Sequence, residues 1–133
     1  MISRDMKDWI VLIVDDEPDN LGVAQKVLKF NGADVHIARN GIEGLAILEG
    51  LKPSFVLLDL SMPQMDGWEM FRRTRSKPEL ADTPIIALTA HAMSGDRERV
   101  MEAGFNGYIA KPFRINSFLE DIQEALSDFF EPS

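Results

Sequence analysis

The chain has 133 residues, the length of one domain, and 45% of them are hydrophobic while 27% are charged. This composition excludes a disordered chain, a collagen-like chain and a coiled coil. The formal net charge of −8 argues against binding to nucleic acid or to an anionic membrane surface, since both need a basic face. The absence of cysteine excludes disulfides, thiolate metal sites and cysteine nucleophiles.

No segment of the sequence predicts export or membrane insertion. The first eight residues alternate in charge, no apolar signal region follows them, and the longest apolar run, residues 9–14, is far shorter than the ~20 residues that span a bilayer. We therefore expect a soluble cytoplasmic domain over residues 9–130, with an N-terminal tail at 1–8 and a C-terminal tail at 131–133.

Five short apolar runs alternate with segments of helical periodicity. The predicted strands cover residues 10–14, 34–38, 55–58, 85–88 and 108–110. Pro18 suits the first turn of a helix, while Asn40, Asp66 and Ser94 are typical N-cap residues of the segments that follow them. Strands that alternate with helices predict a parallel sheet covered by helices on both faces.

The composition of the strands predicts their order in the sheet. The first, third and fourth runs are nearly all apolar, as strands that are covered on both faces must be. The second run contains Asp34 and His36, and the fifth is short, so we place these two at the edges. With right-handed crossovers the order is 2-1-3-4-5, which is a doubly wound α/β fold of the flavodoxin-like type.

Arg39 and Asn40 follow the second predicted strand, at an edge away from the point where the strand order reverses, and polar side chains follow the other four strands as well. The latter are Asp15, Asp16 and Glu17 after the first strand, Asp59 after the third, Thr89 after the fourth and Lys111 after the fifth. In an open parallel sheet, ligands bind outside the carboxyl ends of the strands, where the strand order reverses. We therefore expect carboxylates, a hydroxyl group and an ammonium group to converge on one edge of the sheet.

The mixture of groups at this edge predicts a metal-assisted phosphoryl site. Closely packed carboxylates repel each other unless a cation joins them, and oxygen donors without any soft ligand favour Mg²⁺, with Mn²⁺ as the alternative. Mg²⁺ held by only a few carboxylates commonly works on a phosphoryl group. Lys111 adds a second positive charge and Thr89 a hydroxyl donor, so a carboxylate here can act as the nucleophile and form an aspartyl-phosphate.

Each of these residues also has a simpler structural explanation. The pair Asp15 and Asp16 precedes a helix that it can cap, and Asp59 precedes turn residues that favour a bond to its own backbone. Thr89 alone is more often a structural hydroxyl, and Lys111 alone is more often a solvated lysine. Their joint placement at successive strand ends favours the functional interpretation.

Four motifs give the sequence a resemblance to a known family. They are VLIVDDE at residues 11–17, LLDLSMPQMDG at 57–67, LTA at 88–90 and YIAKPF at 108–113. Over residues 9–130 the sequence resembles the response-regulator receiver domain, the CheY-like module of two-component phosphorelays. The motifs follow the order and spacing of that family.

The resemblance implies a role for each residue of the predicted site. Asp59 resembles the phosphoacceptor and Asp16 the direct Mg²⁺ ligand, with Asp15 acting beside it through water. The backbone carbonyl of Ser61 corresponds to the remaining protein ligand of the metal. Lys111 resembles the lysine that pairs with a phosphoryl oxygen.

The resemblance also implies a conformational switch. Thr89 corresponds to the hydroxyl that moves to bind the phosphoryl group, and Tyr108 to the aromatic residue that turns inward afterwards. In the family, the peptide bond that corresponds to Lys111–Pro112 is cis. Ser61 and His91 fall at positions whose side chains are thought to tune the loss of the phosphoryl group.

As a receiver domain, the chain is expected to be a phosphorylatable signalling switch. The donor would be a phosphohistidine of a sensor histidine kinase or phosphotransfer protein, and the domain would catalyse its own phosphorylation and, weakly, its own dephosphorylation. Phosphorylation would change the surface of the fourth helix, fifth strand and fifth helix, which would bind a downstream protein or form a dimer. The sequence leaves open whether the domain acts alone or belongs to a hybrid kinase or a larger regulator.

Three other functions are disfavoured. A haloacid-dehalogenase-type phosphohydrolase would use the same kind of aspartate nucleophile, but it typically carries a second Asp where this sequence has Ser61. A receiver with an inert pocket would not need the complete set of polar residues. Nucleotide binding is disfavoured because DDEP follows the first strand, where a phosphate-binding turn would present Gly, Ser or Thr.

Other conspicuous residues keep structural or surface interpretations. We expect His36 on the surface of an edge strand, His91 in a solvated loop, and Trp68 packed or half-exposed on the third helix. Phe129 and Phe130 are the apolar residues that we consider first for a partner or dimer surface. The apolar face of the last helix is expected to lie mostly in the core, and it comprises Ile115, Phe118, Leu119, Ile122, Leu126 and Phe129.

Overall fold

The computed structural model describes residues 1–62, 65–90 and 96–132. It contains a five-stranded sheet with the order β2-β1-β3-β4-β5, in which all neighbouring strands are parallel. The strands are β1 (Ile10–Val14), β2 (Asp34–Ala38), β3 (Phe55–Asp59), β4 (Ile85–Thr89) and β5 (Gly107–Ala110). The structure therefore confirms the strand order predicted from the sequence.

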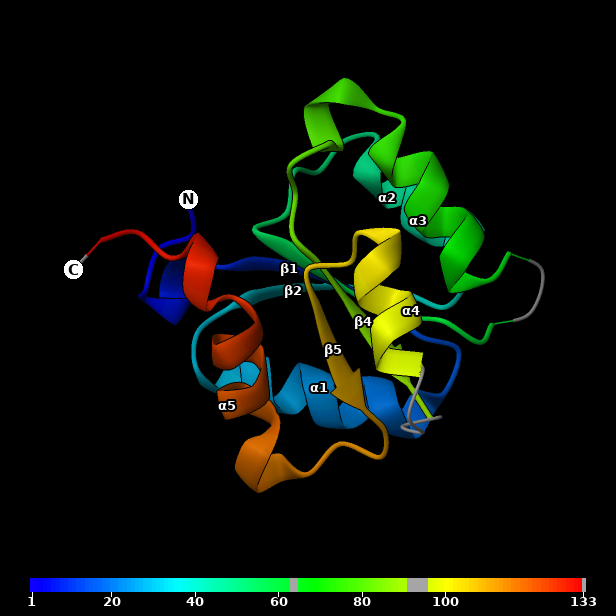
Figure 1. The fold of residues 1–133 in the computed structure, drawn as a ribbon. Coiled ribbons are helices and arrows are strands. Elements are labelled where there is room, and N and C mark those ends of the chain that lie inside the picture. The colour runs from blue at the N-terminus through cyan, green and yellow to red at the C-terminus, as the bar shows by residue number, and fades with distance from the viewer. Residues whose placement is uncertain (63–64, 91–95, 133) are drawn as a thin grey trace.

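Five α-helices cover the two faces of the sheet. They are α1 (Pro18–Phe30), α2 (Gly41–Leu48), α3 (Gly67–Arg75), α4 (Asp96–Ala103) and α5 (Ile115–Ala125). Helices α1 and α5 cover one face, and α2, α3 and α4 cover the other (Figure 1). Within the described ranges, no helix has the length and apolar character needed to cross a membrane. This is the doubly wound α/β fold expected from the sequence.

Successive residues of the inner strands contribute to two separate cores. Val11 and Ile13 belong to the core under α1 and α5, whereas Leu12 and Val14 belong to the core under α2, α3 and α4. Side chains of a strand point alternately to opposite faces, so a strand covered on both sides must be apolar throughout. This explains why β1, β3 and β4 read as continuous apolar runs.

Two helices begin at the N-caps that the sequence predicts. Oδ1 of Asn40 accepts a hydrogen bond from the Glu43 N–H at 2.9 Å, and Oδ1 of Asp66 accepts one from the Glu69 N–H at 2.9 Å. Each side chain satisfies a backbone donor that has no partner within its own helix. The predicted cap Ser94 lies outside the described residues.

The last helix is shorter than its apolar pattern suggests. Helix α5 ends at Ala125, and a 3-10 turn over Ser127–Phe129 continues the chain. Phe118, Ile122 and Leu126 are buried as predicted, but Ile115 is 69% exposed. The apolar face therefore lies mostly in the core, as expected, and Ile115 is an exposed exception. It is the first residue of the helix, and it lines a surface groove instead.

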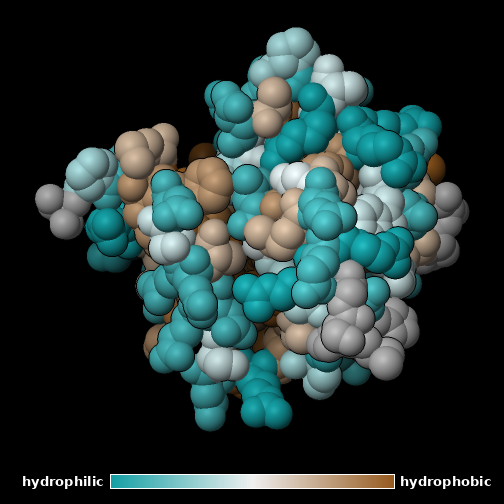
Figure 2. Space-filling model, in the orientation of Figure 1, coloured by the Kyte–Doolittle hydropathy of each residue, from teal (hydrophilic) through white to brown (hydrophobic). Residues whose placement is uncertain are grey.

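The two terminal segments, expected as tails, pack against each other. The N–H of Ile2 donates to the Phe129 carbonyl at 2.7 Å, and the Glu131 N–H donates to the Ile2 carbonyl at 2.8 Å. Ile2 is only 6% exposed, and the ring of Phe130 stacks on Trp9 with their centroids 6.1 Å apart. Figure 1 shows the two ends side by side, and Figure 2 shows hydrophobic residues beside them. Phe129 and Phe130 thus pack partly against the domain.

Candidate functional site

The carboxyl ends of the parallel strands bring the predicted polar residues to one edge of the sheet. Asp59 and Thr89 are the last residues of β3 and β4, while Asp15 and Lys111 directly follow β1 and β5. Because all neighbouring strands are parallel, these residues lie at the same edge. Asp15 and Asp59 are almost completely buried there, with 0% and 2% of their surface exposed.

The side chain of Lys111 connects the two buried aspartates. Its Nζ lies 2.9 Å from Oδ2 of Asp15 and 3.1 Å from Oδ2 of Asp59, and the lysine side chain is itself only 6% exposed. Nζ also lies 3.4 Å from Oε1 of the exposed Glu17. Removing one partner of a buried ion pair leaves the other charge uncompensated. The charges at this site therefore depend on one another.

Both aspartates also bind their own loops. Oδ1 of Asp15 accepts a hydrogen bond from the Glu17 N–H at 3.0 Å, and Oδ1 of Asp59 accepts one from the Ser61 N–H at 3.1 Å. The simpler structural explanation considered for Asp59 is therefore correct for one of its oxygens. The same hydrogen bonds fix each carboxylate so that its second oxygen faces the ammonium group of Lys111.

The start of α3 passes very close to the end of β3, and this contact requires glycine. A Cβ atom at Gly67 would lie 2.2 Å from the carbonyl oxygen of Asp59 and 2.8 Å from Cα of Leu60. The Gly67 N–H also donates to the Leu60 carbonyl at 3.3 Å. Both obstructing atoms belong to the backbone, so a larger residue cannot be accommodated by a rotamer change. The position of Asp59 is thus linked to the absence of a side chain at residue 67.

Burial changes the ionisation of the central pair. It raises the pKa of the Asp59 carboxyl from 3.8 to about 7; the charge of Asp15 raises this pKa further, whereas the Ser61 N–H and Lys111 lower it. Burial lowers the pKa of Lys111, but its contacts with Asp15 and Asp59 outweigh this effect and raise it overall. Near neutral pH the lysine is therefore charged, while the Asp59 carboxyl is divided between its two forms.

The acidic residues at this edge suit a hard cation. Asp15, Asp16, Glu17 and Asp59 each offer a carboxylate oxygen, and these four atoms lie within 4.8 Å of one another. Oδ2 of Asp15 and Oδ2 of Asp59 are buried and, in the described parts of the chain, have no contact with a donor besides the ion pairs with Lys111. Oxygen ligands that are buried and incompletely paired fit Mg²⁺ or Mn²⁺.

The two predicted switch residues lie on neighbouring strands, Thr89 at the end of β4 and Tyr108 two residues before the end of β5. Thr89 is 7% exposed, and its backbone carbonyl accepts a hydrogen bond from the Lys111 N–H at 2.8 Å. Tyr108 in β5 is half-buried; burial first, and the charge of Asp96 next, raise the pKa of its hydroxyl. The Lys111–Pro112 bond is cis, the conformation that the resemblance implies. These positions are compatible with the roles expected for them.

Two residues of the site were given no role from the sequence. Glu17 is the N-cap of α1 but makes no capping hydrogen bond with its side chain, which instead approaches Lys111. Its position directly after two aspartates was the available signal. Gly67 is the last residue of the motif at 57–67, but its close approach to Asp59 depends on the tertiary structure. His91, a predicted neighbour of the site, lies outside the described residues.

Comparisons of the sequence find related proteins along most of the chain. The model of the response regulator receiver domain matches residues 11–123. The polar-differentiation response regulator DivK of Brucella anthropi is 34% identical over 118 residues, which cover 89% of this chain and 96% of that protein. An uncharacterized 14.6 kDa protein of Leptolyngbya boryana is 41% identical over 102 residues, which cover 77% of this chain and 78% of that protein.

Solved structures show the same fold. The chemotaxis response regulator CheY4 of Vibrio cholerae has a TM-score of 0.83 and 28% sequence identity, and the match covers 89% of this chain and 98% of that chain. The receiver domain of the sensor histidine kinase PA1611 of Pseudomonas aeruginosa, solved with a magnesium ion coordinated in its active site cleft, has a TM-score of 0.79 and 34% identity. That match covers 90% of this chain and 98% of that chain.

A doubly wound α/β domain with this strand order and this acidic edge is a CheY-like module. The chain belongs to the response regulator receiver domain family, whose members act in two-component signalling. The family and the fold that the sequence predicts are thereby confirmed.

Proposed function

We propose that the domain is a signalling switch whose Asp59 accepts a phosphoryl group from a phosphohistidine. The donor is a sensor histidine kinase or a phosphotransfer protein, and the phosphorylated domain changes its affinity for a downstream protein. The observation that carries this proposal is the buried arrangement in which Lys111 joins Asp15 and Asp59. Membership of the receiver family supports it, as does the name of the relative DivK, a response regulator. We place this activity in the cytoplasm.

In the proposed reaction, a carboxylate oxygen of Asp59 attacks the phosphorus in line with the bond to the donor histidine. The O–P bond forms as the N–P bond breaks, and the imidazole nitrogen leaves with the electron pair. Oδ1 of Asp59 already accepts the Ser61 N–H, so we assign Oδ2 as the attacking atom. The Lys111 ammonium, now 3.1 Å from Oδ2, then pairs with a phosphoryl oxygen and stabilises the added charge.

The residues at this edge fit a divalent cation, which we propose to be Mg²⁺. Asp16 and Asp59 would hold it directly, Asp15 through water, and Ser61 through its backbone carbonyl. When bound, the ion would neutralise the carboxylates and the charge on the phosphoryl oxygens. The magnesium ion in the PA1611 receiver domain supports this choice, and Mn²⁺ is the alternative.

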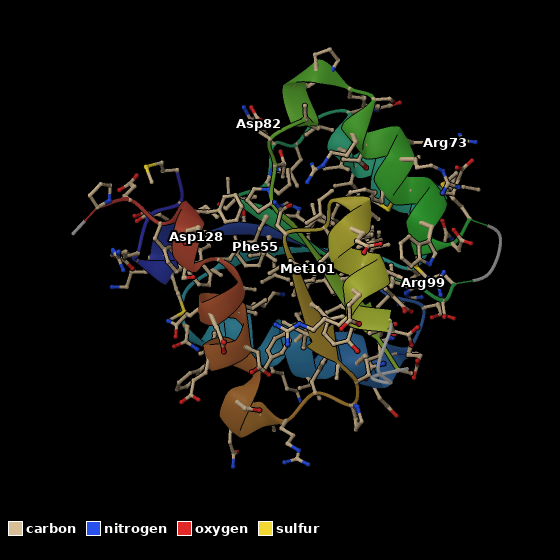
Figure 3. All side chains as sticks on the ribbon, viewed as in Figure 1. Phe55, Arg73, Asp82, Arg99, Met101 and Asp128 are labelled. Carbon is tan, nitrogen blue, oxygen red and sulfur yellow. The ribbon has the colours of Figure 1, made fainter. Side chains whose placement is uncertain are left out.

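We propose that phosphorylation reaches the surface through Thr89 and Tyr108. The hydroxyl of Thr89 moves toward the new phosphoryl group, and the ring of Tyr108 then fills the space that the hydroxyl leaves. Tyr108 lines a groove of about 340 Å³ between α4 and α5, together with Met101 and Glu124. Met101 lies on α4 (Figure 3) and is 46% exposed. A downstream protein or a second receiver would bind this surface.

Intact-mass spectrometry after incubation with acetyl phosphate and Mg²⁺ tests the proposed acceptor. We expect the wild-type protein to gain the mass of one phosphoryl group, and to gain none without Mg²⁺. The Asp59→Asn variant should gain none, whereas Asp121→Asn, which changes an exposed aspartate on α5, should gain the same mass as the wild type.

A second probe distinguishes a short-lived phosphoryl group from an inert pocket. Beryllofluoride imitates the phosphoryl group without being hydrolysed, so it should stabilise the wild-type domain against heat in the presence of Mg²⁺. No mass gain and no response to beryllofluoride, with Mg²⁺ binding verified, would show that the domain is an inert receiver. Mass gain by the Asp59→Asn variant would place the acceptor elsewhere.

A further inference from the structure

A groove between α1 and α5 presents an apolar surface outside the buried cluster of Lys111, Asp15 and Asp59. It has a volume of about 790 Å³, and its apolar lining includes Pro18, Val23, Val27, Phe30, Ile115 and Leu119. Phe30 and Ile115 are 90% and 69% exposed, the largest values among the large apolar side chains of the described residues apart from that of Met1. A monomer gains nothing from exposing two such side chains beside one groove, and apolar patches of this kind commonly mark interaction surfaces.

Gly22 lies in the groove, in the interior of α1, and no described residue requires a glycine there. A Cβ atom at this position would meet no atom of the described residues within 4 Å. Glycine inside a helix is unfavourable by roughly 1 kcal/mol relative to alanine, because it loses more backbone freedom on folding. A glycine on an open helix face is useful where another backbone approaches closely. The exposed face of α1 is therefore suited to contact with a second helix.

The charges beside the groove indicate that the second helix is α1 of another copy of this chain. Asp19 and Lys26 are both exposed, both line the groove, and lie on either side of the Gly22–Val23 midpoint at equal distances of about one helical turn. If two copies of α1 cross antiparallel at this midpoint, Asp19 of each copy faces Lys26 of the other. The helix face is thus complementary in charge to itself under a two-fold rotation, as a symmetric dimer interface must be.

We propose that two copies of this chain associate through their α1 helices, antiparallel and crossing at Gly22 and Val23. Each copy places its α1 on the apolar groove of the other, covers part of the exposed Phe30 ring, and contributes one Asp19–Lys26 pair at each end. We expect a small and transient contact, with a dissociation constant on the order of 100 µM. This inference does not rest on the proposed phosphorylation.

Sedimentation equilibrium over a range of concentrations tests the association, and a pair of charge reversals tests its geometry. In Asp19→Lys, both pairs of the dimer become lysine facing lysine, and in Lys26→Glu both become carboxylate facing carboxylate. Each variant alone should dimerise at least tenfold more weakly than the wild type. An equimolar mixture of the two variants should recover the affinity, because both pairs are then of opposite charge. The double variant Asp19→Lys/Lys26→Glu should recover it as well.

Matched variants separate this interface from general effects of charge and hydrophobicity. Lys29→Glu makes the same charge change on an exposed residue of α1 that does not line the groove, and it should leave the dimer unchanged. Phe30→Ser should weaken the dimer at least tenfold, whereas Ile42→Ser, at another exposed apolar residue, should not. Gly22→Ala should raise the melting temperature of the dilute monomer and yet weaken the dimer.

The recovery in the mixture is the decisive result, because no misfolding of a single variant produces it. A protein that stays monomeric at millimolar concentration would overturn the proposal. Dimerisation that Phe30→Ser and both charge reversals leave unchanged would also overturn it, and would show that another surface associates.

Discussion

Nζ of Lys111 lies 3.1 Å from Oδ2 of Asp59, and both side chains are almost completely buried. The contact joins the ends of β3 and β5, two strands that are not neighbours in the sheet. Since Lys111 contacts Asp15 at the end of β1 as well, one ammonium group connects three strands at the edge where the phosphoryl group is proposed to bind. A substitution at either residue should therefore change both the stability of the fold and the phosphorylation of the domain.

Replacing Asp59 by asparagine should stabilise the fold at alkaline pH. The pKa of this carboxyl is about 7 in the folded protein, whereas its ordinary value, expected in the unfolded chain, is 3.8. Between pH 4 and 7 the folded protein therefore keeps a proton on Asp59 that the unfolded chain has released. The free energy of unfolding of the wild type therefore decreases as the pH rises from 4 to 7, and it stays low above pH 7. Asn does not titrate, so Asp59→Asn should raise the free energy of unfolding by about 1–3 kcal/mol at pH 8, and by less as the pH falls toward 4.

Urea unfolding at a series of pH values measures this effect. Asp121→Asn serves as the control, because it removes an exposed carboxylate and should change the stability little at any pH. A gain for Asp59→Asn that does not depend on pH would mean that burial does not control the ionisation of Asp59.

Replacing Lys111 by methionine should destabilise the domain in a way that Mg²⁺ reverses. The raised pKa of Lys111 means that its charge stabilises the folded state until the pH rises above about 10.5, its ordinary pKa. Without it, Asp15 and Asp59 face each other with no cation, which we expect to lower the free energy of unfolding by about 1–3 kcal/mol at pH 8. The Mg²⁺ proposed to bind the folded state at this edge should restore most of this loss.

Thermal unfolding with and without Mg²⁺ provides the measurement for Lys111→Met. The exposed Lys52 gives a matched variant, Lys52→Met, which should show no extra response to the ion. An equal shift in both variants would argue against a cation site at this edge.

Replacing Gly67 by alanine should displace the backbone of Asp59, although residue 67 contributes no side chain to the site. The new Cβ would lie 2.2 Å from the Asp59 carbonyl oxygen, so the start of α3 must move away from β3. We expect a loss of about 2–4 kcal/mol of stability and slower phosphorylation by acetyl phosphate. Gly50→Ala is the control, since a Cβ there meets no atom of the described part of the chain within 4 Å. Equal behaviour of the two variants would contradict the close approach.

Replacing Ile2 by alanine should show that the terminal segment is part of the folded domain. Ile2 is buried where the two terminal segments meet. We expect the substitution to lower the free energy of unfolding by about 2–3 kcal/mol, measured by chemical unfolding. Ile42→Ala, at a side chain that is 55% exposed, should cost less than about 1 kcal/mol. If the two substitutions have the same small effect, residues 1–8 are a loose tail in solution.

Much of the fold follows from the sequence because its signals are local. Apolar runs of three to five residues identify the strands, and the N-caps Asn40 and Asp66 mark where helices begin. The polar residues at Asp34 and His36 place β2 at an edge, since a covered strand cannot hold them. Parallel strands end at one edge, and so the order of the motifs alone predicts that Asp15, Asp59 and Lys111 meet.

The tertiary structure decided the geometry in which these groups meet and the packing of the two chain ends. The contact of Lys111 with both aspartates, the raised pKa of Asp59 and the glycine requirement at residue 67 depend on distances between segments far apart in the sequence. Ile2, expected in a tail, is buried, and Ile115 is exposed although it belongs to a helix face that lies mostly in the core. An apolar side chain in the sequence shows what should be buried, but only the packed chain determines which surface is available to bury it.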